Sequence, residues 1–333
     1  MRTLTSHQLR ELVPMRDAVE LMKAAFASAS AGQTISPLRT PIEMPDGSGV
    51  SLYMPAFVPA SGGNPAGSGA KIVSVFQGNA DRGLPTINAI VIMIDPETGV
   101  PIGIVEGGAM TALRTGAVSG AATDLLARAD ARSLTVIGAG VQGVTQAAAV
   151  AAVRDLDVIH VVDVNPDSAA GFAERLAVWD AAAASKVRVA SSAADVLPAS
   201  DIVCTATTSS TPVFDESDIS DGTHINAVGA FTPQMQEIPT ELLKRARVVV
   251  DQVEAVLHEA GDFIIPIERG EIDRSVVREE LGQIVSGEQP RRESDDEVTF
   301  FKSVGNAIQD MIVGAVALQR AEQRGVGRTI SLD

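Results

Sequence analysis

We predict a protein of the α/β class, in which a parallel β-sheet is covered by helices on both faces. The first observation is the motif G-x-G-x-x-G at Gly138, Gly140 and Gly143, which follows a β-branched apolar run and precedes an alanine-rich stretch. The second is Asp163, an acid at the end of the next apolar run. The third is the alternation of apolar runs with helical segments, because such alternation gives right-handed crossovers and parallel strands. In this order, the three observations are typical of a Rossmann dinucleotide-binding fold.

Each position of the glycine motif has a physical reason. Gly138 can take the tight turn off the strand, Gly140 lets the backbone approach a pyrophosphate, and Gly143 lets the following helix pack close to the sheet. The phosphates are expected at the helix N-terminus, where unpaired N–H groups and the helix dipole favour an anion. Asp163 is expected to bind a ribose 2′-hydroxyl, and residues 164–166 contain no arginine to accept a 2′-phosphate. We therefore expect NAD(H) to be favoured, with NADP(H) as the alternative.

Other cofactor contacts are expected where parallel strands end, because ligands of open α/β sheets lie at the carboxyl ends of the strands. Some of these residues lie within the glycine loop, and the others end the apolar runs DIVCTAT and HINAVG. The expected residues are Ala139, Val141, Gln142, Thr205, Ala206, Thr207, Asn226, Val228 and Gly229.

The composition is that of a globular chain long enough for two domains. It has 333 residues, whereas single hydrophobic cores stop growing at about 250–300 residues. A net charge of −16 argues against nucleic acid and anionic membranes as partners, but permits a small anionic substrate held by a few basic side chains. The single cysteine, Cys204, lies in an apolar run and is expected to be a buried thiol. The four histidines show no metal-ligand spacing, so no metal is expected.

The N-terminal region does not resemble a signal peptide. Glu11, Asp17 and Glu20 interrupt the apolar positions where an uncharged stretch would be needed. The longest strongly apolar run, IVIMI, is far shorter than the ~20 residues that cross a bilayer. A cytoplasmic location is therefore expected.

The first third of the chain predicts helices followed by an antiparallel sheet. Apolar residues recur at helical spacing over residues 6–29, with Pro14 separating two helices. Extended runs with hairpin turns then follow at residues 39–44, 50–58, 71–77 and 87–95. The glycine-rich segment 61–69 is expected to be a flexible connection without a function.

The remainder of the chain predicts the parallel sheet and its helices. A helix rich in small residues over residues 107–131 leads into the strand of the glycine loop. Further strands are expected at residues 158–164, 187–190, 201–207, 224–229 and 247–251. Helical segments are expected after the glycine loop and at residues 167–179, 193–197 and 240–244. The charged segment 287–297 predicts a solvated loop, and residues 299–324 predict a long closing helix packed outside the sheet.

Three strings, RTGAVSG at 114–120, GAGVQG at 138–143 and FKSVGNAIQD at 301–310, make the chain similar to the ornithine cyclodeaminase and mu-crystallin family. The resemblance runs along nearly the whole chain. It implies a homodimer in which residues 1–120 and 305–333 form an N-terminal α/β substrate-binding and dimerisation domain completed by the C-terminal helix. Residues 121–304 would form the Rossmann domain that holds NAD(H) or NADP(H).

The resemblance also implies the substrate site. Arg39, Lys71 and Arg114 are expected to point into a cleft between the domains, where guanidinium groups hold a carboxylate and the catalytic Lys71 orients it or relays a proton. Met54 and Phe231 are expected to line the apolar side of the substrate. Further cofactor contacts implied by the family pattern are Thr115, Ser303 and Gly305.

One departure from the family pattern bears on the activity. The deaminating cyclase and the family's alanine dehydrogenases carry an aspartate at about the position of Phe231, where this chain has Gly229, Ala230 and Phe231. The missing acid argues against ornithine cyclodeamination and against free ammonia as a substrate. The string GAFTPQM instead resembles the cyclic ketimine reductases, which act on Δ1-pyrroline-2-carboxylate and Δ1-piperideine-2-carboxylate.

Four alternatives stay open beside a ketimine reductase that forms L-proline or L-pipecolate. Within the enzymes they are an alanine-type amino-acid dehydrogenase, an ornithine cyclodeaminase and an N-alkylating, opine-like reductase. Outside them is a mu-crystallin-like protein that binds NAD(P) and a small ligand without turnover. The presence of Arg39, Lys71 and Arg114 together weighs against the last, because a binding protein has no chemical need for all three.

Overall fold

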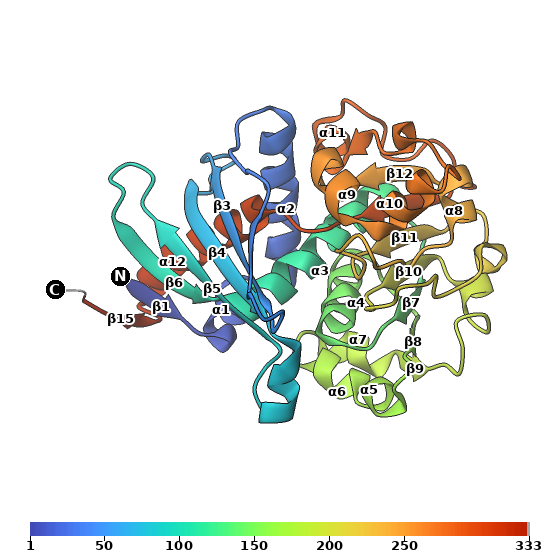
Figure 1. The fold of residues 1–333 in the computed structure, drawn as a ribbon, viewed down its shortest axis with the longest axis horizontal. Helices are drawn as coiled ribbons and strands as arrows, with labels where there is room; N and C mark the ends of the chain where they lie inside the picture. The colour runs from blue at the N-terminus through green and yellow to red at the C-terminus, as the bar shows by residue number, and fades with distance from the viewer. Residues whose placement is uncertain (332–333) are drawn as a thin grey trace. The chain divides into compact units, whose positions relative to one another are not determined.

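The computed structural model describes residues 1–331 and divides into two compact units (Figure 1). Unit 1 contains Met1–Arg114 and the segment from Asn306 onward, and unit 2 contains Thr115–Gly305. The division falls inside helix α3 (Gly107–Leu126), which contributes residues to both units. Within the described residues, no helix combines the length and the apolar character that crossing a bilayer requires.

Unit 1 is built on one mixed sheet with the strand order β15-β1-β6-β5-β4-β3-β2. Its strands are β1 (Arg2–Leu4), β2 (Thr40–Glu43), β3 (Val50–Val58), β4 (Gly67–Val75), β5 (Ile87–Ile94), β6 (Pro101–Glu106) and β15 (Arg328–Thr329). Strands β2 to β6 are antiparallel neighbours, whereas β1 pairs with β6 in parallel. The predicted antiparallel sheet is therefore confirmed, and β6 adds one further antiparallel strand after β5.

The helices of unit 1 pack on one face of this sheet. Besides the first part of α3, they are α1 (Ser6–Leu12), α2 (Met15–Ser30) and α12 (Ala307–Arg324), with Pro14 between the first two as predicted. Helix α12 contacts β3, β4 and β5 on the sheet and α2 beside it. Helix α12 therefore packs in the same unit as the N-terminal helices and strands.

The segment 61–69 is not wholly a flexible connection, so that expectation was wrong for its last residues. Gly67 and Gly69 lie within β4. A side chain on Gly67 would collide with the Met311 carbonyl of α12, and one on Gly69, which has φ +150, with the Ile92 carbonyl of β5. These glycines let the strand approach its neighbours closely.

Unit 2 is an eight-stranded parallel sheet with the order β13-β12-β14-β11-β10-β7-β8-β9, as the alternation predicted. Its strands are β7 (Ser133–Ile137), β8 (Val158–Val162), β9 (Val187–Val189), β10 (Ile202–Thr205), β11 (His224–Ala227), β12 (Arg247–Val250), β13 (Glu279–Glu280) and β14 (Thr299–Lys302). Strand order reverses beside β7, where such folds bind their ligands.

The expected helix over residues 299–324 was wrong in its first part. Thr299–Lys302 forms the fully buried strand β14 between β11 and β12. The run TFFK suits a buried strand because it is β-branched and aromatic. The helix begins only after Asn306, whose side chain accepts a hydrogen bond from the Ile308 N–H at 3.0 Å and so caps α12.

Short helices cover the parallel sheet on both faces. They are α4 (Val141–Val153), α5 (Pro166–Ala170), α6 (Phe172–Ala177), α7 (Ala181–Ser185), α8 (Thr240–Arg245), α9 (Val253–Glu259), α10 (Gly261–Glu268) and α11 (Leu281–Ser286). The single helix expected over 167–179 is broken at Gly171 into α5 and α6. The helix expected over residues 193–197 is absent: residues 193–196 form a bend and a turn, and Leu197 begins a 3-10 turn (Leu197–Ala199) that contains Pro198.

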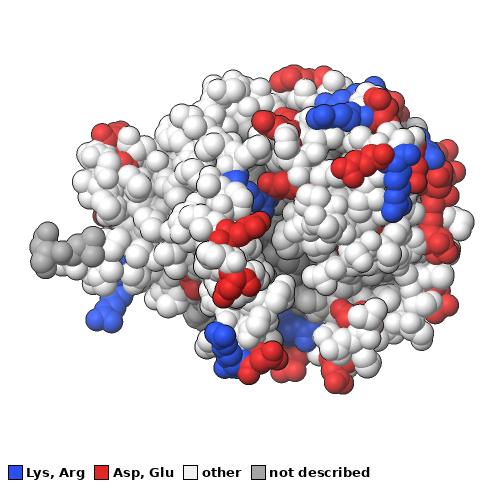
Figure 2. All heavy atoms as spheres, in the orientation of Figure 1, with Lys and Arg blue, Asp and Glu red and all other residues white. Residues whose placement is uncertain are grey.

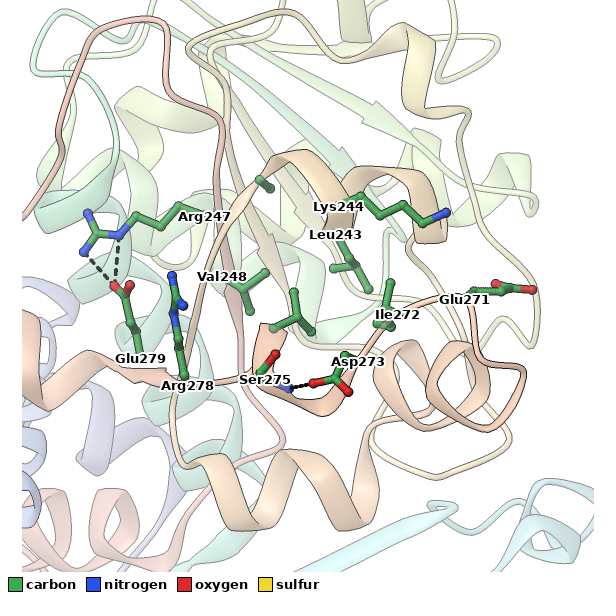
Figure 3. A pocket seen from close by; sticks show the side chains of 12 residues that line it. Leu243, Lys244, Arg247, Val248, Glu271, Ile272, Asp273, Ser275, Arg278 and Glu279 are labelled. Atoms are coloured by element: carbon green, nitrogen blue, oxygen red, sulfur yellow. Dashed lines mark hydrogen bonds and ion pairs between the residues drawn. The ribbon is translucent and has the colours of Figure 1, made fainter.

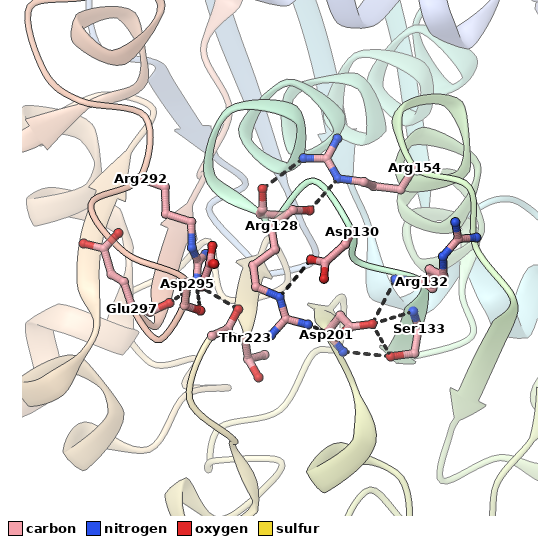
Figure 4. Close-up of polar contacts among 12 residues, drawn as sticks. Arg128, Asp130, Arg132, Ser133, Arg154, Asp201, Thr223, Arg292, Asp295 and Glu297 are labelled. Carbon is pink, nitrogen blue, oxygen red and sulfur yellow. Dashed lines mark hydrogen bonds and ion pairs between the residues drawn. The ribbon is translucent and has the colours of Figure 1, made fainter.

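A polar network ties together the edge of the sheet where the strands begin (Figure 4). The Asp201 carboxylate, just before β10, accepts hydrogen bonds at 2.9 Å from the backbone N–H groups of Arg132 and Ser133 at the start of β7. Arg128 pairs with the same carboxylate at 2.5 Å. Arg292, from the predicted loop 287–297, donates to nearby backbone carbonyls. This edge is thus closed by its own contacts, and the opposite, carboxyl edge carries the glycine loop.

Candidate active site

Three elements of unit 1 bring charged side chains together in its interior. Lys71 of β4 lies 2.9 Å from Asp310 of α12, measured from Nζ to Oδ2. Arg114 of α3 lies 3.4 Å from the other oxygen of Asp310 and donates a hydrogen bond to Gln309 at 2.7 Å. All four side chains are buried. The structure therefore gathers two of the three predicted cations around one carboxylate.

The position of Lys71 follows from the strand pattern. Side chains alternate along β4, and Lys71 lies on the face covered by α12. Its neighbours in register are Met54 of β3 and Val91 of β5, both buried. A charged ammonium between apolar neighbours needs a counter-ion, and Asp310 supplies it.

Burial and neighbouring charges tune this lysine. Burial, together with the positive charges of Arg114 and Arg39, lowers the pKa of Lys71 to about 8, although Asp310 acts in the opposite direction. A group with such a pKa can exchange a proton near neutral pH. Arg39, half-buried just before β2, thus belongs to the same electrostatic cluster.

Asp310 and Gln309 were not among the predicted site residues. Both lie in the string FKSVGNAIQD, which carried the family resemblance, so a signal was present in the sequence. Their role depends on contacts between α12 and segments far away in the chain, which local patterns do not reveal.

The glycine loop of unit 2 fits a dinucleotide pyrophosphate. Gly138 has φ +103, and a side chain there would meet the Ala206 carbonyl at 2.5 Å. A side chain on Gly143 would collide with the Gly138 carbonyl, whereas the space around Gly140 is open. Helix α4 begins after Gly140 without a side-chain cap, which leaves N–H groups of its first turn for an anion.

Asp163 lies directly beside this loop. One carboxylate oxygen accepts a hydrogen bond from the Ala139 N–H at 2.6 Å, and the other from the Asn165 N–H at 2.7 Å. Each carboxylate oxygen has a second lone pair, so a ribose hydroxyl can still donate to the group.

A buried carboxylate that the sequence did not reveal holds the next two strand ends. Glu237 accepts hydrogen bonds from the N–H groups of Thr207 at 2.6 Å, Gly229 at 2.7 Å and Ala230 at 3.0 Å. Its side chain is fully buried, and burial raises its pKa. Behind it, Asp262 accepts from the Glu237 N–H at 2.7 Å and pairs with Lys302 at 2.6 Å. Since both of its oxygens are occupied by N–H donors, Glu237 organises the loop.

Most of the remaining predicted cofactor residues are buried, and several are held by hydrogen bonds within unit 2. Ser303 and Gly305 both donate to the buried Asp251, at 2.7 and 2.9 Å. The side chain of Asn226 packs inward and donates to Thr123 of α3 at 2.9 Å. Gln146 of α4 donates to the Thr115 carbonyl at 3.1 Å. Further buried members of the predicted set are Ala139, Thr205 and Val228, whereas Val141 is exposed.

A separate pocket of unit 2 is formed by α8, β12 and residues 271–279 (Figure 3). Two of its charged groups bind within the pocket: Arg247 pairs with Glu279 at 2.7 Å, and Asp273 accepts from the Ser275 N–H at 2.8 Å. Among the described residues, none of those that line this pocket is a predicted site residue. We assign it no function.

A dinucleotide-type glycine loop on a parallel sheet, together with a buried cationic cluster, defines the class of NAD(P)-dependent oxidoreductases with small anionic substrates. The sequence model of the ornithine cyclodeaminase/mu-crystallin family matches residues 2–325. The chain belongs to this family, which confirms the resemblance seen in its sequence.

Individual relatives agree with this assignment over nearly the whole chain. The chain is 39% identical over 331 residues to the Δ(1)-pyrroline-2-carboxylate reductase of Bacillus cereus, covering 99% of each chain. It is similar to the structure of Thermococcus litoralis Δ(1)-pyrroline-2-carboxylate reductase in complex with NADH and L-proline, with a TM-score of 0.92, 39% identity, and 99% of this chain and 100% of that chain covered. An archaeal alanine dehydrogenase dimer with bound NAD has a TM-score of 0.89 at 31% identity, covering 100% of this chain and 99% of that chain.

Proposed function

We propose that this protein uses NADH to reduce a cyclic ketimine carboxylate, Δ1-pyrroline-2-carboxylate or Δ1-piperideine-2-carboxylate, to L-proline or L-pipecolate. The observation that carries the proposal is the buried cluster of Lys71 and Arg114 around Asp310. The full-length similarity to reductases named for this reaction supports it.

The cluster suits a small planar anion with a C=N bond. Arg39 and Arg114 would hold the substrate carboxylate, and Met54, buried next to Lys71, would contact the apolar ring. Phe231, which is 38% exposed, is proposed as a second apolar contact. Positioning and charge supply most of the rate in such a reaction, because a protonated imine is already a good hydride acceptor.

Lys71 supplies the proton of the reduction. Its ammonium donates a proton to the ring nitrogen of the neutral imine, which makes the C=N carbon a good hydride acceptor. The neutral Lys71 side chain then regains a proton from water. When bound, NADH supplies the hydride that adds to the ring carbon. A lysine with a pKa of about 8 can run this cycle near neutral pH.

NADH is the cofactor that the glycine-loop geometry favours. Asp163 places a negative charge where a 2′-phosphate would be repelled, and the neighbouring structures contain NADH or NAD. NADPH stays as the alternative cofactor.

A homodimer formed through unit 1 is the second part of the proposal. The helices cover one face of its sheet, and the other face carries Tyr53, Ile72 and Ile90 in register across β3, β4 and β5. Tyr53 is 38% and Ile90 42% exposed. Few charged side chains lie over unit 1 in the view of Figure 2. An exposed apolar sheet face of this kind is typical of an interaction surface, and the archaeal alanine dehydrogenase is a dimer.

A substrate panel tests the proposed activity. We expect NADH oxidation with both cyclic imines and formation of the L-amino acid, and little oxidation with pyruvate plus ammonia or with pyruvate plus methylamine. Lys71→Ala and Arg114→Ala should each lower kcat/KM at least about 100-fold, since removing one positioned group that stabilises the transition state typically costs about 100- to 1000-fold in rate. Arg320→Ala is the control. Arg320 is a partly exposed residue of α12 that pairs with Asp17 of α2, so its loss should leave kcat/KM unchanged.

Two outcomes would contradict this activity. Faster turnover with pyruvate plus ammonia than with either imine would favour the alanine-dehydrogenase alternative. Tight binding of NADH and an imine without turnover would favour the binding-protein alternative.

A further inference from the structure

We propose that Asp310 is a positioning residue of the reduction: from the first turn of α12 it holds the Lys71 ammonium as the proton donor and braces Arg114 beside it. This inference rests on the proposed function, because it assigns the group that makes Lys71 effective. It concerns a residue that acts through its neighbours and need not contact the substrate.

The geometry gives each oxygen of Asp310 a separate partner. Lys71 lies 2.9 Å from Oδ2, and Arg114 lies 3.4 Å from Oδ1. Gln309, the preceding residue, accepts a hydrogen bond from Arg114 at 2.7 Å. One turn of one helix thus fixes both cations, which come from β4 and α3.

The fold also favours a negative charge at this point. Asp310 lies in the first turn of α12, where the helix dipole stabilises a carboxylate. The Asn306 side chain caps the same helix and fixes where it begins. Asp310 has no exposed surface, so its partners in the cluster replace water.

The groups facing Lys71 show what depends on Asp310. Arg114 from α3 and Arg39 from the segment before β2 are positive, and the register neighbours Met54 and Val91 are apolar. Asp310 is the acid that favours the charged form of Lys71. Without it, burial and two positive neighbours all favour the neutral amine, which has no proton to donate.

The first test is the pH profile of kcat/KM for the cyclic imine. Activity of the wild type should fall above about pH 8, where Lys71 loses its proton. In Asp310→Asn, which keeps the size of the side chain but removes its charge, we expect this fall at least one pH unit lower. Lower kcat is expected even at the optimum, since the lysine is less firmly held.

A matched control removes a different acid paired with the same helix. Asp17 pairs with Arg320 of α12 at 2.7 Å and is partly exposed. Asp17→Asn should leave the profile within about 0.2 pH units of the wild type. An unshifted profile in a folded Asp310→Asn would overturn the proposal, as would an equal shift in Asp17→Asn.

Asp310→Glu covers the case in which Asp310→Asn does not fold. It keeps the charge but moves the carboxylate, so the alkaline fall should stay near its wild-type pH while kcat drops at least about 10-fold. Wild-type kcat in this variant would show that the place of the carboxylate does not matter, and would also overturn the proposal.

A binding measurement separates this inference from the proposed activity. Pyrrole-2-carboxylate is a planar five-membered-ring carboxylate that cannot accept hydride in the same way, and its Kd should rise with pH as Lys71 becomes neutral. That rise should begin at least one pH unit lower in Asp310→Asn than in the wild type. If the wild type reduces no imine but this shift in Kd is seen, the proposed activity is refuted and the control of the Lys71 charge by Asp310 still holds. If the wild type shows neither turnover nor binding, both proposals are refuted.

Discussion

The Asp163 carboxylate accepts a hydrogen bond at 2.6 Å from the backbone N–H of Ala139, which joins the end of β8 to the glycine loop. This contact fixes the acid beside the place where an adenosine ribose would lie in a fold of this type. The carboxylate therefore shapes the loop, and we propose that it also selects the cofactor.

Replacement of Asp163 should therefore change the cofactor preference. In Asp163→Ser we expect the KM for NADH to rise about 10- to 100-fold, equivalent to about 1.4–2.7 kcal/mol, and the KM for NADPH to fall relative to it. Steady-state kinetics with both nicotinamides measures the ratio. The exposed Asp155 provides the control Asp155→Ser, and an unchanged NADH/NADPH ratio in Asp163→Ser would disprove the role of this acid.

Removal of the Glu237 charge alone should lower the stability of the protein and weaken NADH binding. Both of its oxygens accept from backbone N–H groups, so the amide of Glu237→Gln must turn its own N–H groups toward a donor. We expect the free energy of unfolding to fall by about 1–3 kcal/mol and the KM for NADH to rise about 10-fold, because the loops after β10 and β11 lose their common anchor.

Thermal unfolding and NADH kinetics of Glu237→Gln test this together. Glu241→Gln, at an exposed position of α8, removes an acid a short way along the chain and should change neither quantity. Wild-type Tm and KM in Glu237→Gln would show that the anchor is unimportant.

Comparison of Asp163 with Asp310 and Glu237 shows which parts of the candidate site could be predicted from the sequence. The glycine loop and Asp163 were predicted because their signal is local: a strand, the glycine spacing, a helix, a second strand and the acid follow one another in the sequence. Asp310 and Glu237 were missed because a buried carboxylate is recognised by partners that the fold brings to it. Strand β14 was missed for a related reason. Its sequence TFFK lies directly before the helical pattern of α12, and only its pairing with β11 and β12 in the fold identifies it as a strand.

His224 should make the fold sensitive to acid. It is fully buried, bonded to Thr299 at 2.9 Å, and burial lowers its pKa to about 3 from 6.5. Below pH 6.5 the unfolded chain therefore takes up a proton that the folded chain does not, so stability falls by up to about 1.4 kcal/mol per pH unit. The loss should continue until about pH 3, where the folded form also accepts the proton.

The slope of Tm between pH 7 and pH 4 measures this effect. His224→Gln cannot take up the proton, so its Tm should fall less steeply than that of the wild type, whatever its Tm at pH 7. The exposed His258 gives the control His258→Gln, whose slope should match the wild type. Equal slopes in all three proteins would rule out His224 as the source.

The apolar face of the sheet in unit 1 should determine the oligomeric state. Ile90 lies near its middle, in register with Ile72 and Tyr53. A charge buried in an apolar interface without a partner is strongly unfavourable, so Ile90→Lys should dissociate a dimer that forms there. In a monomer the same lysine would lie in solvent and cost little, because Ile90 is 42% exposed. Light scattering coupled to size-exclusion chromatography should show a dimer for the wild type and a monomer for the variant, with Val189→Lys on β9 of unit 2 remaining dimeric. A monomeric wild type, or a dimer unaffected by Ile90→Lys, would show that this face has another use.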